Sequence, residues 1–155
     1  MIQDYRDLLA ELVRADARFL IVGAHALSVH GVPRGTVDLD VWIAASPDNA
    51  KRVWAALAAF GAPLESLHIR ESDFTRPDMI AQVGLPPWRI DILTSVTGVT
   101  FDEAWDERVE DLFDGVRVPF IGRAAFIGNK RASGRTKDLA DIESLGGESH
   151  ASKSS

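Results

Sequence analysis

Residues 18–43 read RFLIVGAHALSVHGVPRGTVDLDVWI, and the order of the parts of this segment indicates an α/β fold. The first apolar run predicts a strand over residues 18–22 that ends at Gly23. Residues 24–30 predict a short helix, and residues 37–43 predict a second strand that carries two aspartates. A glycine at a helix start followed by paired carboxylates favours a phosphate site held by a metal ion.

The two aspartates, Asp38 and Asp40, are expected on the same side of their strand. Side chains alternate between the faces of a strand, so Leu39 and Val41 take the opposite, core-facing side. The Cα atoms of the two aspartates then lie about 6.5 Å apart. Such carboxylates repel each other unless a cation such as Mg²⁺ lies between them. A solvated polar strand face is the alternative, because isolated Asp-x-Asp pairs are common there.

A third carboxylate, Asp91, lies in the sequence WRIDIL over residues 88–93. The flanking isoleucines predict a strand whose apolar side faces the core. If this strand lies beside residues 37–43, three carboxylates converge and could hold two metal ions. The alternative is an ion pair between Asp91 and Arg89, which share a face of the strand.

Several other residues are candidates for phosphate binding. Gly23 and Ala24 lie where a strand gives way to a helix, so their backbone N–H groups can approach a phosphate. Arg34 and Thr36 lie in the loop before the acidic strand, where Arg34 could bind a phosphate or brace the carboxylates. Lys130, on a later helix, could neutralise triphosphate charge. Neither a Walker A loop nor a dinucleotide-binding glycine motif is present.

The composition indicates a soluble, cytoplasmic protein. It has no cysteine, so thiol chemistry is excluded. The 155 residues predict one domain over residues 1–145, followed by a disordered tail over 146–155. No apolar run is long enough to span a membrane, and the absence of cysteine excludes disulfides and cysteine-bound zinc. The net charge of −6 argues against broad nucleic-acid binding. Residues 115–137, however, carry basic charges only, which favours a local anion site.

The remaining segments complete a mixed α/β pattern. His25 and His30 are five residues apart on the short helix, a spacing that favours packing or hydrogen bonding over a shared metal. A loop is expected over residues 62–78, with a short strand around residues 67–69. The other predicted elements are helices over 4–15, 47–60, 101–105, 123–132 and 136–145, and strands over 79–83, 88–93, 109–113 and 116–120. Ser46 is the expected N-cap of the helix over 47–60, and Asp114-Gly115 predicts a hairpin turn between the last two strands.

Four blocks of the sequence carry a resemblance to a known family. They are VGAHA at residues 22–26, HGVPRGTVDLD at 30–40, IDIL at 90–93 and KRASGRTKDLAD at 130–141. Their order and spacing resemble the small bacterial nucleotidyltransferases of the polymerase-β superfold, especially proteins similar to the abortive-infection toxin AbiEii. The resemblance spans most of residues 18–145.

This resemblance implies a fold, a reaction and a set of residue roles. The fold is an α/β (α+β) nucleotidyltransferase domain with a mixed central sheet flanked by helices. The reaction moves a nucleoside monophosphate from an NTP to a hydroxyl or phosphate acceptor, with two Mg²⁺ ions. By this likeness Asp38 and Asp40 bind the metals, Asp91 completes the metal site and helps to deprotonate the acceptor, and Lys130 contacts the nucleotide phosphates. The Gly23-Ala24 pair, which would cradle the triphosphate, departs from the Gly-Gly or Gly-Ser usual in the family.

Three functions are compatible with these features. The first is an enzyme of a toxin–antitoxin system that modifies tRNA or a protein and has a cognate partner. The second is an antitoxin or other interaction module that kept the fold and lost the reaction. The third is a small-molecule nucleotidyltransferase of the antibiotic-resistance kind.

Overall fold

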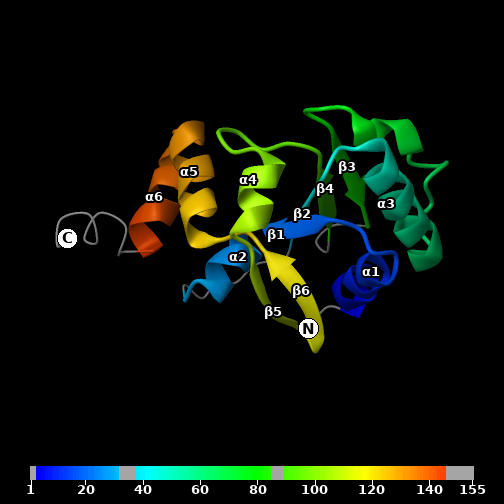
Figure 1. Cartoon of the computed structure of the whole chain (residues 1–155), viewed down its shortest axis with the longest axis horizontal. Coiled ribbons are helices and arrows are strands. Elements are labelled where there is room, and N and C mark those ends of the chain that lie inside the picture. Colours follow the sequence, from blue (N-terminus) through cyan, green and yellow to red (C-terminus); the bar gives the residue numbers. More distant parts are fainter. Residues whose placement is uncertain (1–2, 32–37, 85–88, 146–155) are drawn as a thin grey trace.

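The computed structural model describes residues 3–31, 38–84 and 89–145 of the chain, and Figure 1 shows the arrangement of its elements. The expected tail over 146–155 lies outside the described residues. In chain order the elements are α1 (Gln3–Arg14), β1 (Phe19–Val22), α2 (Ala24–Val29), β2 (Leu39–Ile43), α3 (Pro47–Phe60), η1 (Glu71–Thr75), β3 (Ile80–Val83), β4 (Ile90–Leu93), α4 (Phe101–Asp106), β5 (Val109–Phe113), β6 (Val116–Phe120), α5 (Arg123–Ser133) and α6 (Thr136–Leu145).

The strands form one six-stranded mixed sheet in the order β3-β4-β2-β1-β6-β5. The central strand β1 is antiparallel to β2 and parallel to β6, and β2 is parallel to β4. The edge strands β3 and β5 are each antiparallel to their neighbour. The expected mixed α/β fold is therefore confirmed.

The sheet has a separate apolar cluster on each face. On one face, side chains of β1, β2 and β4 pack with α1 and α3. On the other, Leu20, Val22 and Trp42 pack with residues of α2, α4 and α5. In Figure 1, α1 and α3 lie together at one side of the molecule, and α5 and α6 lie together at the other. Among the described residues, no helix is long and apolar enough to cross a membrane.

The segments with the clearest local signals form as predicted. Helix α3 begins after Ser46, whose hydroxyl accepts a hydrogen bond from the Asn49 backbone at 3.2 Å. The predicted hairpin of β5 and β6 turns at Asp114 and Gly115, with φ values of 49° and 85°. Two consecutive left-handed residues are what a tight hairpin turn requires. Strand β2 begins at Leu39, and β4 begins at Ile90.

The predicted strand around residues 67–69 is wrong. Leu67 donates its backbone N–H to the carbonyl of Pro63 at 3.0 Å, and His68 has a φ of 58°. These local hydrogen bonds and the left-handed residue bend the chain into turns, so it cannot extend as a strand. A short 3₁₀ helix, η1, follows instead.

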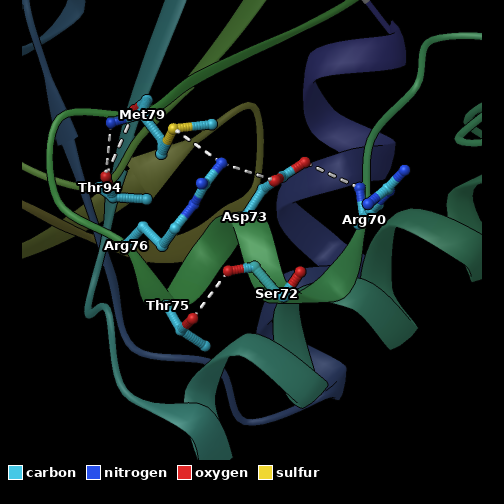
Figure 2. A network of polar contacts seen from close by, with 7 residues as sticks. All are labelled: Arg70, Ser72, Asp73, Thr75, Arg76, Met79 and Thr94. Carbon is cyan, nitrogen blue, oxygen red and sulfur yellow. Dashed lines mark hydrogen bonds and ion pairs between the residues drawn. The ribbon is translucent and has the colours of Figure 1, made fainter.

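A network of polar contacts joins η1 to the start of the edge strand (Figure 2). The Asp73 carboxylate accepts a hydrogen bond from the Arg70 backbone at 2.9 Å and pairs with Arg76 at 3.2 Å. The same guanidinium lies 3.6 Å from the Met79 sulfur, and the Met79 N–H donates to the Thr94 hydroxyl at 2.9 Å. The network ties the turn to the β3–β4 pair, which fixes where β3 begins.

Candidate active site

The three candidate carboxylates lie on two neighbouring parallel strands. Asp40 of β2 and Asp91 of β4 are register partners, and Asp38 comes directly before β2. The residues that alternate with them, including Leu39 and Ile90, are buried in the cluster beneath α1 and α3. Asp40 and Asp91 therefore face the side of the sheet on which α2, α4 and α5 pack. The two acidic strands thus lie side by side, which is the condition for the carboxylates to converge.

Arg89 lies between two of these carboxylates. Its Nη2 atom is 3.3 Å from Oδ2 of Asp38, and its Nε atom is 3.6 Å from Oδ1 of Asp91. The second distance is too long for a hydrogen bond. Both Nε of Arg89 and Oδ1 of Asp91 are buried and lack any hydrogen-bond partner. The ion pair foreseen as the alternative role of Asp91 is thus present, but it leaves one carboxylate oxygen with unused lone pairs.

The environment of Asp91 acts on its pKa in opposing directions. Burial raises the pKa of Asp91, and the negative charge of Asp38 raises it too. The Arg89 charge and a hydrogen bond from the Gln82 side chain lower the pKa and so oppose this shift. Gln82 is the register partner of Asp91 on the edge strand β3. The Asp91 carboxyl group therefore has Arg89 near it in the same chain segment and Gln82 beside it on the neighbouring strand β3.

A buried tyrosine of α1 forms a hydrogen bond to the backbone beside the site. The Tyr5 hydroxyl of α1 donates to the backbone carbonyl of Arg89 at 3.2 Å, and the Leu39 N–H donates to the same oxygen at 3.0 Å. Burial, followed by the charges of the three aspartates, raises the pKa of Tyr5 to about 12. The phenol therefore stays protonated and keeps its donor. One carbonyl oxygen joins α1, β2 and β4 directly beside the acidic site.

The two histidines have contacts of the kind predicted for them. The His25 ring stands edge-on to Tyr5, with centroids 5.9 Å apart, and tilts against Phe113 at 5.3 Å. Burial lowers the pKa of His25, and a hydrogen bond to the backbone of Asp38 opposes the shift. His30 Nε2 contacts the carbonyl of Ile121 at 2.8 Å. His25 therefore packs between Tyr5 and Phe113.

Gly23 brings the start of α2 against Asp40. Its φ is 72°, and a Cβ atom added there would collide with the Asp40 carboxylate. Only glycine combines this left-handed backbone with so close an approach. Ala24 follows as the first residue of α2 and is half-buried. The predicted phosphate-binding pair thus adjoins one of the predicted metal-binding carboxylates.

The other predicted phosphate ligands are farther along the chain or outside the described part. Lys130 lies in the last turn of α5, with its ammonium 5.4 Å from the centroid of the Phe126 ring. Arg131 shares that turn, whereas Arg117 is exposed on β6. Arg34 and Thr36 lie outside the described residues, so their roles stay predictions.

The donor set fits a metal ion that the substrate helps to bind. Within residues 3–31, 38–84 and 89–145, no three His, Asp or Glu side chains form a ready-made metal cage. Mg²⁺ usually binds to one or two carboxylates and completes its shell with water and substrate phosphates. The close carboxylates of Asp40 and Asp91 and the unpartnered Oδ1 atom of Asp91 suit that mode.

Family comparison identifies the class of enzyme. Residues 2–146 match the family described as nucleotidyltransferase of unknown function, DUF6036. The chain belongs to this family. It is therefore a nucleotidyltransferase, which favours the enzyme over a non-catalytic interaction module. No curated protein matches this nucleotidyltransferase.

Two solved structures share the fold at low sequence identity. A candidate nucleotidyltransferase from Thermotoga maritima has a TM-score of 0.60 and 11% identity, covering 92% of this chain and 88% of that one. The lincosamide antibiotic adenylyltransferase LnuA, bound to lincomycin, has a TM-score of 0.58 and 15% identity, covering 94% of this chain and 96% of that one. Both likenesses support the nucleotidyltransferase fold, whereas the narrower likeness to AbiEii stays a prediction.

Sequence reasoning missed Tyr5 and Gln82 as parts of the site. Tyr5 fits the apolar stripe of α1, and its only signal was a polar tip within that stripe. Gln82 gave no signal, because its place beside Asp91 depends on the register of β3 against β4. The role of Tyr5 depends on the packing of α1, and the role of Gln82 depends on the pairing of β3 with β4.

Proposed function

We propose that this nucleotidyltransferase moves a nucleoside monophosphate from an NTP to a hydroxyl or phosphate group of a tRNA or protein, with two Mg²⁺ ions. The observation that carries the proposal is the pairing of Asp40 with Asp91 on adjacent parallel strands, with Gly23 packed on the Asp40 carboxylate. Carboxylates beside a close backbone approach suit a bound triphosphate.

Each candidate residue has a role in this proposal. Asp38, Asp40 and Asp91 would hold the Mg²⁺ ions, which when bound neutralise charge on the triphosphate. The acceptor oxygen attacks the α-phosphorus, the bond to the β-phosphate oxygen breaks and pyrophosphate leaves. Oδ1 of Asp91, buried and without a hydrogen-bond partner, accepts the proton that the acceptor hydroxyl loses.

The remaining groups would bind and orient the triphosphate. Gly23 and Ala24 offer backbone N–H groups next to Asp40. Arg34, Thr36 and Lys130 add polar or positive groups that bind phosphate oxygens. A reaction of this class needs mainly positioning and charge neutralisation, so these few groups suffice.

The biological setting of this proposal rests on the resemblance of the four sequence blocks. An AbiEii-like enzyme would be the toxin or the modifying member of a two-gene system in the cytoplasm, with the neighbouring gene product as its partner. The acceptor would be tRNA or a protein, both of which are abundant there together with NTPs.

A lysate-labelling assay tests the reaction. Purified protein is incubated with Mg²⁺, a cell lysate and each of the four α-labelled NTPs, and the products are separated on RNA and protein gels. One labelled band is expected with the natural enzyme and none with Asp40→Asn. Asp106→Asn, an exposed change at the end of α4, is the matched control and should label normally. Labelling that survives Asp40→Asn would contradict the proposal.

A small-molecule acceptor is the second candidate, and the likeness to LnuA favours it. That structure holds lincomycin on a fold that matches 94% of this chain. Incubation of the protein with labelled ATP and lincomycin or an aminoglycoside, followed by mass spectrometry, would detect an adenylylated drug. A modified drug together with an unlabelled lysate would replace tRNA or protein as the acceptor.

A further inference from the structure

Arg89 is a basic residue that lies against two of the candidate metal ligands. Its guanidinium lies within 3.3 Å of Asp38 and 3.6 Å of Asp91. The two carboxylates belong to different strands, and the arginine bridges them. A single planar cation thus lies where two negative groups would otherwise repel each other.

The backbone of Arg89 is held in part by the N-terminal helix α1. The Tyr5 hydroxyl and the Leu39 N–H both donate to its carbonyl oxygen, at 3.2 and 3.0 Å. Tyr5 is fully buried and packs edge-on against His25. The position of the arginine is therefore set by the N-terminal helix as well as by its own strand.

The guanidinium of Arg89 does not use all of its hydrogen-bond donors. This fits a contact with Asp91 that another cation could replace. The Nε atom is buried and has no hydrogen-bond partner, and the Asp91 oxygen that it faces has none either. A permanent structural ion pair would close this gap, because hydrogen-bonded pairs are much stronger than pairs at longer distance. Here the guanidinium offsets part of the negative charge while the Asp91 lone pairs stay available.

We propose that Arg89 is a built-in counter-ion, which holds Asp38 and Asp91 in place before metal and nucleotide bind, and that Tyr5 fixes this arginine. Both are positioning residues, since neither needs to touch the reacting atoms. Asp38 and Asp91 would also hold Mg²⁺, so the guanidinium of Arg89 would compete with a bound metal for the same carboxylates. This inference rests on the proposed function for its metal and its reaction.

The proposal predicts opposite changes in metal affinity and turnover. Arg89→Met keeps an unbranched apolar stem and removes the competing cation, so Mn²⁺ should bind about threefold more tightly, as expected for a half-exposed ion pair. Turnover should fall about tenfold, with KM for the NTP little changed, because the carboxylates lose their alignment. A purely structural arginine would weaken metal binding and turnover together.

Two further variants refine the test. Tyr5→Phe removes only the hydroxyl, and it should lower turnover in the same direction as Arg89→Met but by less. Arg89→Lys keeps the charge and loses the bridging geometry, so it should restore the natural Mn²⁺ affinity and only part of the turnover. Arg52→Met is the matched control, because Arg52 pairs with Asp16 at 3.7 Å on the surface and should leave both quantities unchanged.

Mn²⁺ titration followed by electron paramagnetic resonance separates failure of this inference from failure of the proposed function. If the natural protein labels no acceptor but Arg89→Met binds Mn²⁺ more tightly, the counter-ion role stands and the reaction does not. If Arg89→Met binds Mn²⁺ as the natural protein does or more weakly, the counter-ion role is overturned. A natural protein that binds no Mn²⁺ overturns it as well. Should Arg89→Met not fold, turnover decides: natural turnover in both Tyr5→Phe and Arg89→Lys would overturn the counter-ion role, and lowered turnover in both would support it.

Discussion

The Asp40 carboxylate lies in the space that any side chain at residue 23 would need. Gly23→Ala should therefore abolish labelling, because the new methyl group pushes Asp40 away and the left-handed backbone is strained. Gly31→Ala is the control: its φ is 92°, and nothing lies within 4 Å of an added Cβ. That variant should lose about 1–2 kcal/mol of stability from the backbone alone and keep its activity. Equal activity in the two variants would refute this reading of Gly23.

Gln82 should influence the reaction through Asp91. Gln82→Leu keeps the size of the side chain and removes the hydrogen bond to the Asp91 carboxyl group. Turnover should fall about tenfold, the usual effect of losing a residue that orients a ligand, while KM for the NTP changes little. Ile80→Thr, on the same face of β3 and 59% exposed, is the control and should behave normally. Steady-state kinetics with the labelled acceptor would measure both, and unchanged turnover in Gln82→Leu would deny the residue this role.

Asn49 should contribute strongly to stability. Its side chain accepts from the Arg18 N–H at 2.7 Å and donates to the carbonyls of Arg18 and Ala44, at 3.0 and 2.8 Å. Asn49→Ala leaves these backbone groups without partners and should cost about 2–3 kcal/mol in free energy of unfolding. Urea denaturation measures the loss. Lys51→Ala, exposed on the same helix, should change stability by less than about 0.5 kcal/mol.

The start of α4 should make stability depend on pH in the acid range. Hydrogen bonds from the Thr100 hydroxyl and backbone lower the pKa of Glu103 from its ordinary value of 4.5. The folded state then binds this proton less readily than the unfolded state, so the stabilisation exists above pH 4.5 and is lost as the pH falls further. Glu103→Gln should flatten the corresponding part of the pH profile of the denaturation midpoint. A profile that is unchanged below pH 4.5 in Glu103→Gln would contradict this contribution.

Local signals in the sequence predicted the parts of the fold that depend on few distant contacts. The cap at Ser46 defined the start of α3, and the Asp114-Gly115 pair defined the β5–β6 turn. The segment around residues 67–69 failed because its turns depend on hydrogen bonds between backbone groups that periodicity does not reveal. Apolar residues in such a turn resemble a short strand.

The sequence predicted the carboxylates of the candidate site but not the residues that contact them and their strands. Alternation along the strand placed Asp40 and Asp91 on the polar side, and the strand pairing agrees with that placement. Tyr5 and Gln82 reach the site from α1 and the edge strand β3, so their roles follow from tertiary packing and register. The spacing of residues along the chain does not predict the contact of Tyr5 with Arg89 or that of Gln82 with Asp91.

The hydrogen bond from Tyr5 to Arg89 also has a consequence for synthesis on the ribosome. It joins residues 84 positions apart, so α1 cannot make this contact until the segment around Arg89 has been synthesised. Contacts this distant in sequence form slowly, since a long loop must close before they add stability. The N-terminal half of the nascent chain therefore carries Asp38 and Asp40 but cannot assemble the arginine bridge. The bridge between Asp38 and Asp91 can therefore close only after residue 91 has left the ribosome.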